Sequence, residues 1–427
     1  MAQHRRPTII VPYGFAHFGK SLFWYTSESL FAFFLTEVCR IPPWHMAVIL
    51  SISIAVNATS DVVVGTMLSR RMARLGDAVG LQVRGAVLSG ACLVGFLASG
   101  LVPASVRLPY AIASLMLFRL AYALYDVPQN VILSLAGRSP AEHNTLSALR
   151  LFGSGCAGLL ISAVFVPLLA GKPAPVQALD TAGLAAAMTV CAIATAVVLW
   201  ARGQTSAGAP PPVAADTTGR SGLPAIMLLA ANLLFSAGTA FFTRLEPYFA
   251  AYGASSHLTG AGVMIVIALG GLLAQPSFAL LARRLSTWRL MTISSLVQMV
   301  GCGALYVALM RPGPAWGVLA PVVVASLIYG FGAGGTMMLS WVALTRVIAR
   351  SGLSAPRTFG LFTFASKLGF AFSTFMLGQM LARGDYHHPW LGNAPLVAMM
   401  TFSPLIGATA YLAFAVAYKP GRDNQNP

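Results

Sequence analysis

One run of the chain, WHMAVILSISIAVNATSDVVVGTML at residues 44–68, decides the class of fold. At the 1.5 Å rise per residue of an α-helix, about 20 apolar residues are long enough to cross the hydrocarbon core of a bilayer. This run also carries Asn57 and Asp61, although the chain has just 11 acidic residues among 427. The stretch therefore predicts a membrane-spanning helix with a carboxylate inside it. Because a charged group is costly within the bilayer, the presence of Asp61 there has to be explained.

The rest of the chain repeats the same apolar pattern. Hydrophobic residues make up 57% of the chain and charged residues 9%, and the mean hydropathy is +0.75. In an ordinary soluble domain about a quarter of the residues are charged. The N-terminus has no short apolar core followed by a small-residue cleavage site, so we expect no secretory signal peptide. The sequence predicts twelve spanning helices, near residues 14–36, 44–68, 82–103, 108–134, 144–169, 178–201, 223–250, 258–282, 290–310, 315–345, 358–381 and 392–418.

The distribution of the basic residues indicates how the chain lies in the membrane. In a soluble protein, the net charge of +16 would suggest a nucleic-acid partner. Here most of the 27 lysines and arginines fall in cytoplasmic segments if both termini are cytoplasmic, as the positive-inside rule requires. We expect a multi-pass protein of the inner (cytoplasmic) membrane with both termini in the cytoplasm, partnered by the lipid bilayer and not by nucleic acid.

A polar stretch near the middle divides the chain into two similar halves. ARGQTSAGAPPPVAADTTGRSG at residues 201–222 is rich in Pro, Gly and Ala and reads as a flexible linker. The basic turn MLSRRMARLG at 67–76 has a counterpart in LLARRLSTWR at 280–289. We expect an N-terminal six-helix bundle at 1–201, a cytoplasmic linker at 202–222 and a C-terminal six-helix bundle at 223–427. Two pseudo-symmetric bundles of this kind are the major facilitator arrangement.

Motifs of cofactor or metal chemistry are missing from the sequence. GFGAGG at 330–335 has no preceding strand and no Lys-Ser/Thr, and within a spanning helix glycines favour close packing. The histidines show no HxxxH pair, and the cysteines form no CxxC or CxxxC pair, so we expect neither a metal site nor disulfides. No nucleophile and base are paired, so we expect no enzyme and no cofactor. The cysteines are Cys39, Cys92, Cys156, Cys191 and Cys302.

Ionisable residues inside the predicted spans indicate a polar cavity. Each costs about 2.5 to 3.5 kcal/mol at the bilayer centre, so such residues usually face a partner or a water-accessible cavity. Helical spacing places Arg119, Tyr122, Asp126 and Asn130 on one stripe and puts Asn57 one turn from Asp61. Internal ion pairing is the alternative, above all for Arg244 and Glu246. The nine ionisable residues are Lys20, Glu28, Asp61, Arg119, Asp126, Arg150, Arg244, Glu246 and Lys367.

Four stretches of the chain resemble a known transporter family. They are YGFAHFGKS at 13–21, NATSDVVVG at 57–65 with RMARLG at 71–76, LYDVPQNVILSLAGRSPAEHNTLSALRLFGSGCAG at 124–158, and FGLFTFASKLGFAFSTFMLG at 359–378. In order and spacing they are similar to the signatures of the glycoside-pentoside-hexuronide cation symporters, which include the melibiose permease. The resemblance implies a secondary active transporter that couples a sugar-like solute to a cation.

The resemblance also implies roles for individual residues. Lys20, Tyr122, Asp126 and Arg150 match positions that line the sugar site. Thr363 and Lys367 match polar positions of span eleven, and Asp61 matches the second of two carboxylates that hold the coupling cation. The sequence departs from the pattern where Ser21 replaces a sugar-binding aspartate, Glu28 a tyrosine and Asn130 an aromatic residue. It also departs where Asn57 replaces the first carboxylate, Ser60 an amide and Ala123 a threonine.

These departures favour a proton over sodium as the coupling ion. Sodium needs several oxygen ligands to replace its hydration, and the matched site has lost a carboxylate and at least one oxygen. A proton needs a single base, and a low-dielectric pocket favours the protonated form of a carboxylate. We therefore expect Asp61 to be the proton carrier, with Lys367 or Arg150 as the nearby competing cation. The expected coupling residues are Asp61, Asn57, Ser60 and Lys367.

The identity of the solute stays open at this point. Five bases against four acids in the spans would tolerate an anion, although Arg119 could instead neutralise Asp126 or Glu28. A sugar-like or anionic small solute is the first hypothesis. The alternatives are a lysolipid or another amphiphile, proton-coupled efflux of a metabolite or drug, and a scaffold that does not transport. We expect a monomer whose binding residues are Lys20, Ser21, Glu28, Arg119, Tyr122, Asp126, Asn130, Arg150 and Thr363.

Overall fold

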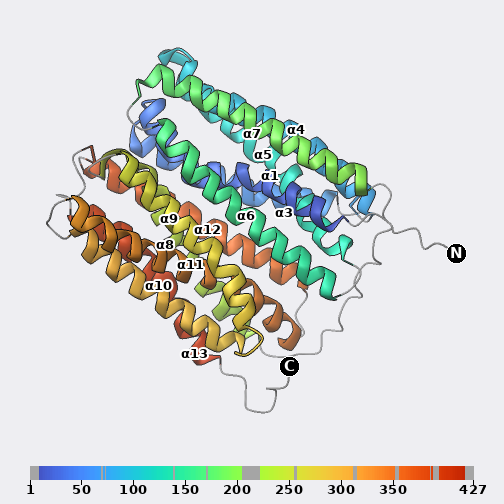
Figure 1. The fold of residues 1–427 in the computed structure, drawn as a ribbon. Helices are drawn as coiled ribbons and strands as arrows, with labels where there is room; N and C mark the ends of the chain where they lie inside the picture. The colour runs from blue at the N-terminus through green and yellow to red at the C-terminus, as the bar shows by residue number, and fades with distance from the viewer. Residues whose placement is uncertain are drawn as a thin grey trace. The chain divides into compact units, whose positions relative to one another are not determined.

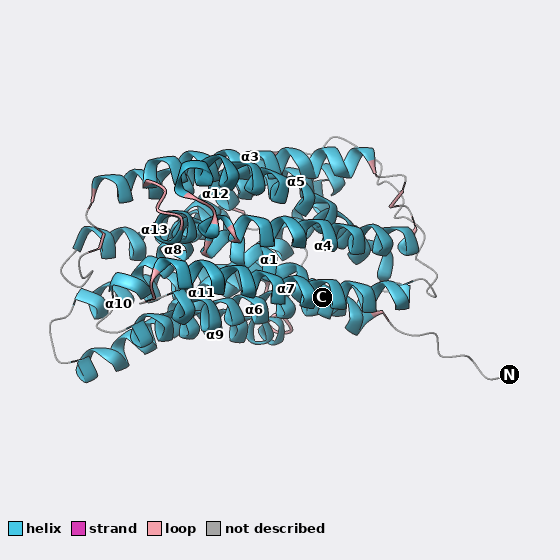
Figure 2. Cartoon of the chain, turned by 90° about the horizontal axis from the view of Figure 1, so that it is seen from above, coloured by secondary structure: helices cyan, strands magenta, loops and turns pink. Residues whose placement is uncertain are grey.

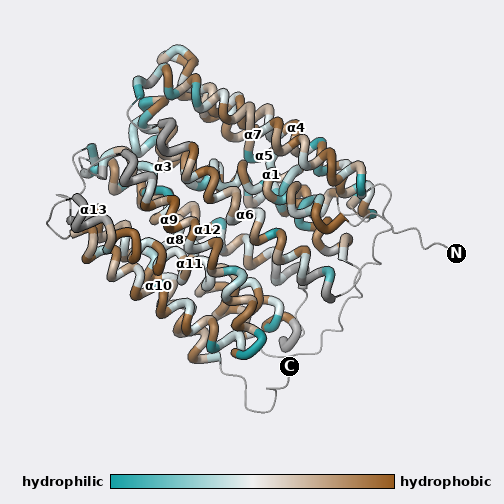
Figure 3. The backbone as a smooth tube through the Cα atoms, in the orientation of Figure 1, coloured by the Kyte–Doolittle hydropathy of each residue, from teal (hydrophilic) through white to brown (hydrophobic). Residues whose placement is uncertain are grey.

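The computed structural model of the chain is built from long helices. It describes residues 9–68, 71–72, 74–137, 140–169, 172–203, 222–253, 257–310, 315–351, 355–384, 386–387 and 394–418. Among these residues every regular element is helical, as Figure 2 shows. Large apolar side chains on these helices are exposed, for example Val190 at 67% and Val307 at 65%, and brown, hydrophobic stretches dominate the helices in Figure 3. Such side chains suit contact with lipid.

The first half of the chain supplies nine helical elements. They are α1 (Ile10–Ser29), α2 (Phe31–Phe33), the π-helix η1 (Phe34–Val38), α3 (Pro43–Met67), α4 (Leu75–Leu97), the 3₁₀-helix η2 (Ser99–Leu101), α5 (Ala104–Ala136), α6 (Pro140–Leu169) and α7 (Ala174–Gly203). Prolines at the N-termini of α3 and before α5 are favourable there, because the first helical turn has no backbone partner for an amide hydrogen.

The second half supplies the remaining elements in the described part of the chain. They are α8 (Leu223–Tyr248), the π-helix η3 (Phe249–Gly253), α9 (His257–Leu281), α10 (Thr287–Met310), α11 (Ala315–Ser351), α12 (Ala355–Arg383) and α13 (Ala394–Ala417). Eleven described helices are long and apolar enough to cross a membrane. The remaining predicted span, 14–36, corresponds to α1, α2 and η1, where Lys20 and Glu28 lower the hydropathy. The expectation of an all-helical membrane protein is confirmed.

The chain divides into two compact units, which we describe separately. The N-terminal unit comprises Met1–Ile161 and Gly171–Val213, and the C-terminal unit comprises Ser162–Ala170 and Ala214–Pro427. In the N-terminal unit, α4 packs on α5 and α7, α1 on α7, and α3 on α5 (Figure 1). In the C-terminal unit, α11 packs on α9 and α10, and α8 on α12 and α13. Apart from Arg202, Gly203 and Gly222, the proposed linker 202–222 lies outside the described residues.

Glycines set the closest helix contacts of the C-terminal unit. A Cβ atom at Gly330 would collide with the carbonyl of Ile267 in α9, and one at Gly332 would collide with the backbone of Gln298 in α10. Gly334 lies against the backbone of Gly271 in the same way. These are the glycines of GFGAGG, so the structure supports their interpretation as packing residues and not as a nucleotide loop.

Candidate functional site

Charged side chains of the N-terminal unit, buried or partly buried, gather in two groups. The first, which we call the Lys20 cluster, comprises Lys20, Asp61, Asp126 and Arg150. The second, which we call the Arg119 cluster, comprises Arg119, Glu28, Ser27, Ser53 and Asn57. Both clusters draw on α1, α3 and α5, and the Lys20 cluster also draws on α6.

An ion pair lies at the centre of the Lys20 cluster. Lys20 Nζ in α1 lies 2.6 Å from Asp126 Oδ1 in α5, and the two side chains are 9% and 15% exposed. Asp61 in α3 and Arg150 in α6 lie close enough to act electrostatically on Lys20. One lysine is thus shared, in electrostatic terms, between two acids. Charges this deeply buried are stable when each has a partner, and removing one partner is costly.

Aromatic residues border the Lys20 cluster. The rings of Trp24 and Tyr122 stack with centroids 6.4 Å apart, and Tyr122 also contacts Phe118 and Tyr125. Asp61 and Asp126 both act electrostatically on Tyr122, whose hydroxyl oxygen is buried and makes no hydrogen bond within the described part of the chain. The predicted placement of Tyr122 beside Asp126 on one stripe of α5 agrees with this geometry.

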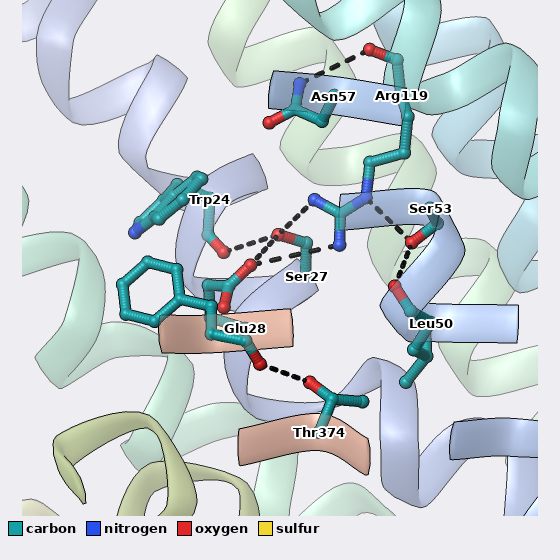
Figure 4. A network of polar contacts seen from close by, with 9 residues as sticks. Trp24, Ser27, Glu28, Leu50, Ser53, Asn57, Arg119 and Thr374 are labelled. Atoms are coloured by element: carbon teal, nitrogen blue, oxygen red, sulfur yellow. Dashed lines mark hydrogen bonds and ion pairs between the residues drawn. The ribbon is translucent and has the colours of Figure 1, made fainter. Parts of the chain in front are cut away.

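The Arg119 cluster ties three helices together. The Arg119 guanidinium is 3.8 Å from Glu28 Oε1, and it donates hydrogen bonds of 3.3 Å to Ser27 Oγ and to Ser53 Oγ, as Figure 4 shows. It also lies over the rings of Phe31 and Phe118. Arg119 is 1% exposed. Of the alternatives left open by the sequence, the structure adopts the pairing of Arg119 with Glu28.

The other predicted coupling residues make hydrogen bonds of their own or lie in the C-terminal unit. Asn57 donates its amide hydrogen to the backbone carbonyl of Arg119, at 3.4 Å. The hydroxyl of Ser60 donates to the carbonyl of Val56 in its own helix, at 2.7 Å. Lys367 is buried in α12 of the C-terminal unit.

The remaining predicted binding residues occupy varied environments. Ser21 in α1 is buried and shares a hydrogen bond of 3.0 Å with Ser154 in α6. The side-chain oxygen of Asn130 is buried without a hydrogen-bond partner among the described residues. Thr363 is exposed in α12, and its hydroxyl donates to the carbonyl of Gly360.

Arg244 and Glu246 do not pair with each other in the described part of the chain. Two residues apart on α8, they project on nearly opposite sides of the helix. The Arg244 guanidinium lies over the ring of Phe370, 5.7 Å from its centroid. Among the described residues, the ion pairing expected of these two residues is therefore not a pairing with each other.

Sequence reasoning missed several polar partners. Ser27 and Ser53 complete the Arg119 cluster, and His17 hydrogen-bonds Ser154 at 3.0 Å. Ser53 lies one helical turn before Asn57, so its spacing was a usable signal. Nothing in the spacing reveals the contact between His17 and Ser154, because it joins two helices 137 positions apart.

Metal chemistry finds no support in the described residues. No group of three or more His, Cys, Asp or Glu side chains there is placed to hold a metal ion. All five cysteines are free thiols. In the segment between η1 and α3, burial raises the pKa of the Cys39 thiol to about 12, so this thiol stays protonated at neutral pH.

Two compact helical units, with ion pairs between spanning helices of the N-terminal unit, are the arrangement of a transport protein of the major facilitator type. Residues 12–418 match the family described as MFS/sugar transport protein, and the chain belongs to that family. A curated relative, the putative glycoside/cation symporter YagG of Escherichia coli (strain K12), is 24% identical over 160 residues. The match covers 37% of this chain and 35% of the relative, so it spans about a third of the length of that protein.

Solved structures of transporters share the fold. A crystal structure of a D-xylose-proton symporter has a TM-score of 0.65 at 15% identity, with 95% of both chains covered. The xylose transporter XylE from E. coli, in a partially occluded inward open conformation, has a TM-score of 0.66 at 14% identity, with 98% of this chain and 99% of that chain covered. The peptide transporter POT in complex with sulfate reaches 0.68 at 15% identity, covering 98% and 96%. The predicted major facilitator fold is confirmed, and the family and these structures are those of transporters and not of enzymes.

Proposed function

We propose that the chain is a secondary active transporter that couples the movement of a small sugar-like solute to a proton by alternating access. It would lie in the inner membrane with both termini in the cytoplasm, and it would act as a monomer. The observation that carries this proposal is the Lys20 cluster, in which one buried cation is shared between Asp126 and Asp61. Membership of a sugar transport family supports the class of cargo.

The Lys20 cluster suggests how proton and solute would be linked. When Asp61 carries a proton, Lys20 has a single anionic partner, Asp126, and the ion pair of 2.6 Å is undisturbed. When Asp61 loses the proton, two carboxylates compete for Lys20 and the pair is weakened. A solute that binds through Lys20 and Asp126 would therefore bind with different affinity in the two states, which is the thermodynamic requirement for coupling.

The surroundings of Asp61 support a proton over sodium. Sodium would need several oxygens to replace its hydration shell. Position 57 offers an amide where the related family has a carboxylate, and the hydroxyl of Ser60 donates within its own helix. One of the transporters that share the fold is itself a D-xylose-proton symporter, which supports the choice of a proton as the coupling ion.

The Arg119 cluster bears on the charge of the solute. Because Arg119 is buried and paired with Glu28, it offers no free cation to an anionic solute. Within the spans of the N-terminal unit, anion binding would then rest on Lys20 and Arg150. We favour a neutral sugar-like solute, and the similarity to YagG, a putative glycoside/cation symporter, supports this choice.

The proposal is tested with Asp61→Asn in proteoliposomes under an inward proton gradient, with D-xylose, D-galactose and D-glucuronate as probes. The wild type should accumulate a probe and make the outer solution more alkaline. The variant should lose accumulation but keep exchange of labelled probe, because asparagine can neither bind nor release the proton. Asp180→Asn is the matched control, since Asp180 forms a partly exposed pair with Lys172. Undiminished accumulation in Asp61→Asn would refute the coupling role.

A further inference from the structure

In each unit, a partly buried hydrogen bond between side chains ties the first long helix to the fifth. In the C-terminal unit, Asn232 of α8 donates to Ser366 Oγ of α12, at 2.7 Å, and to the carbonyl of Phe362. Its oxygen accepts from Tyr411 of α13. In the N-terminal unit, His17 of α1 bonds Ser154 Oγ of α6, at 3.0 Å. The side-chain amide of Asn232 is therefore enough to link the two helices in the C-terminal unit, whereas the N-terminal unit uses a histidine.

The tie in the N-terminal unit leaves hydrogen-bonding capacity unused, whereas both polar atoms of Asn232 have partners. Nε2 of His17 bonds Ser154, but Nδ1 is buried without a partner among the described residues. The whole side chain is 2% exposed. The ring of Tyr13 stacks on it, with centroids 6.1 Å apart and planes inclined by 26°, and so fixes its orientation. A buried polar atom without a partner is costly, and a native structure keeps one for a reason.

Other buried polar atoms without partners lie around the same ion pair. Among the described residues, the hydroxyls of Tyr13 and Tyr122 and the side-chain oxygen of Asn130 are in this state. Asp126 acts electrostatically on both tyrosines, and Lys20 and Arg150 act on His17. Such a set of mixed donors and acceptors complements hydroxyl groups, each of which can both donate and accept.

We propose that His17 is a specificity-determining residue whose Nδ1 hydrogen-bonds a hydroxyl group of a polyhydroxylated solute. Nε2 keeps the tie to Ser154, and through it to Ser21. This inference rests on the proposed function, since it assigns a further contact to the solute of the Lys20 cluster.

The two nitrogens can be tested separately. In length, a glutamine side chain places its terminal amide near the position of Nε2, and an asparagine near that of Nδ1. His17→Gln should keep the tie to Ser154 and a melting temperature close to that of the wild type. His17→Asn should weaken the tie but retain a polar group for the solute. The probes are D-xylose, D-galactose and D-glucose with their single-deoxy forms, and binding to the purified full-length protein is measured by calorimetry.

In the wild type, removal of one particular hydroxyl should weaken binding about tenfold, as expected for a lost hydrogen bond to a buried group. His17→Gln should abolish that difference, and His17→Asn should preserve it. Tyr411→Phe, which removes a hydrogen bond in the C-terminal unit, is the control. It should leave the deoxy profile, that is, the affinity of each deoxy form relative to its parent sugar, unchanged. If His17→Gln does not fold, His17→Met replaces it, and it too should abolish the difference in affinity between the sugar and its deoxy form.

Two outcomes overturn the inference and are distinguishable. If His17→Gln retains the deoxy profile of the wild type, His17 is a structural tie and the proposed function stands. If the wild type binds none of the sugars, the solute class fails and the hydroxyl contact fails with it.

Discussion

At the scale of single residues, intramembrane charges in this chain serve two different purposes. Arg119 and Glu28 satisfy each other within a shell of serines and aromatic rings, and Arg119 has almost no exposed surface. Lys20 instead forms a short pair with Asp126 and is also acted on electrostatically by Arg150 and, more weakly, by Asp61. Burial alone does not separate these purposes, because both arginine and lysine are buried. The number of competing partners separates them.

Removing one member of the Arg119 cluster should destabilise the protein. Arg119→Leu leaves Glu28 as a buried carboxylate without its cation, and breaking a buried pair in this way costs about 3 to 5 kcal/mol. The double variant Arg119→Leu/Glu28→Leu should recover much of that loss. Unfolding in detergent micelles measures both. Lys172→Met, at the partly exposed pair with Asp180, should cost less than about 1 kcal/mol. A single variant as stable as the wild type would show that the pair contributes nothing.

The sequence predicts which residues are unusual better than it predicts their partners. Lys20, Asp61, Asp126 and Arg119 stand out because charges are rare in apolar spans. Helical spacing then assigns each to a face. It does not reveal that Lys20 meets Asp126 or that Arg119 meets Ser53, because those contacts depend on which helices are neighbours.

At the scale of elements, the apolar runs predict the helices well and their irregularities poorly. The run at 44–68 becomes α3 at Pro43–Met67, within one residue at each end. The first span is not one continuous α-helix, since it changes at Leu30 and ends in the π-helical turn Phe34–Val38. The first helix of the other unit ends in the π-helical turn Phe249–Gly253. Hydrophobic periodicity does not reveal a π-helical turn, because a single such turn shifts the hydrogen-bond spacing by only one residue.

Close packing of α11 on α10 should be sensitive to a single methyl group. In Gly332→Ala the new Cβ atom meets the backbone of Gln298, so the helices must separate, and we expect a loss of about 1 to 3 kcal/mol. Gly303→Ala in α10 is the matched control, since no atom lies within 4 Å of its Cβ position. That variant should be neutral or more stable by up to about 1 kcal/mol, because alanine favours a helix over glycine. Equal melting temperatures for the two variants would contradict the close contact.

At the scale of the whole molecule, the two halves have a similar succession of long helices but differ in the paired charges within them. Among the described residues, five helices of the first half and six of the second are long and apolar enough to cross a membrane, and a hydrogen bond links α1 to α6 and α8 to α12. The paired charges within the spans, Lys20 with Asp126 and Arg119 with Glu28, lie in the N-terminal unit. The apolar pattern of the sequence predicts this succession of long helices. It does not predict which charges meet in the described part of the chain, because those contacts depend on which helices are neighbours.

The orientation in the membrane follows from the basic residues of the whole chain and can be measured. In a cysteine-free background, Ser206→Cys in the proposed linker should react with a membrane-impermeant maleimide only after the cells are opened. His387→Cys, an exposed position after α12, should react in intact cells. The reverse pattern would place both termini outside and would overturn the assignment.

The glycine contacts of α11 have a mechanical consequence. Where Gly330, Gly332 and Gly334 bring backbone against backbone, α9, α10 and α11 have no intervening side chains that could change rotamer and let the helices slide. These three helices should therefore move together as one rigid body. Any bending of the C-terminal unit during transport therefore has to occur outside these helices. The π-helical turn Phe249–Gly253, which follows α8, is a suitable hinge.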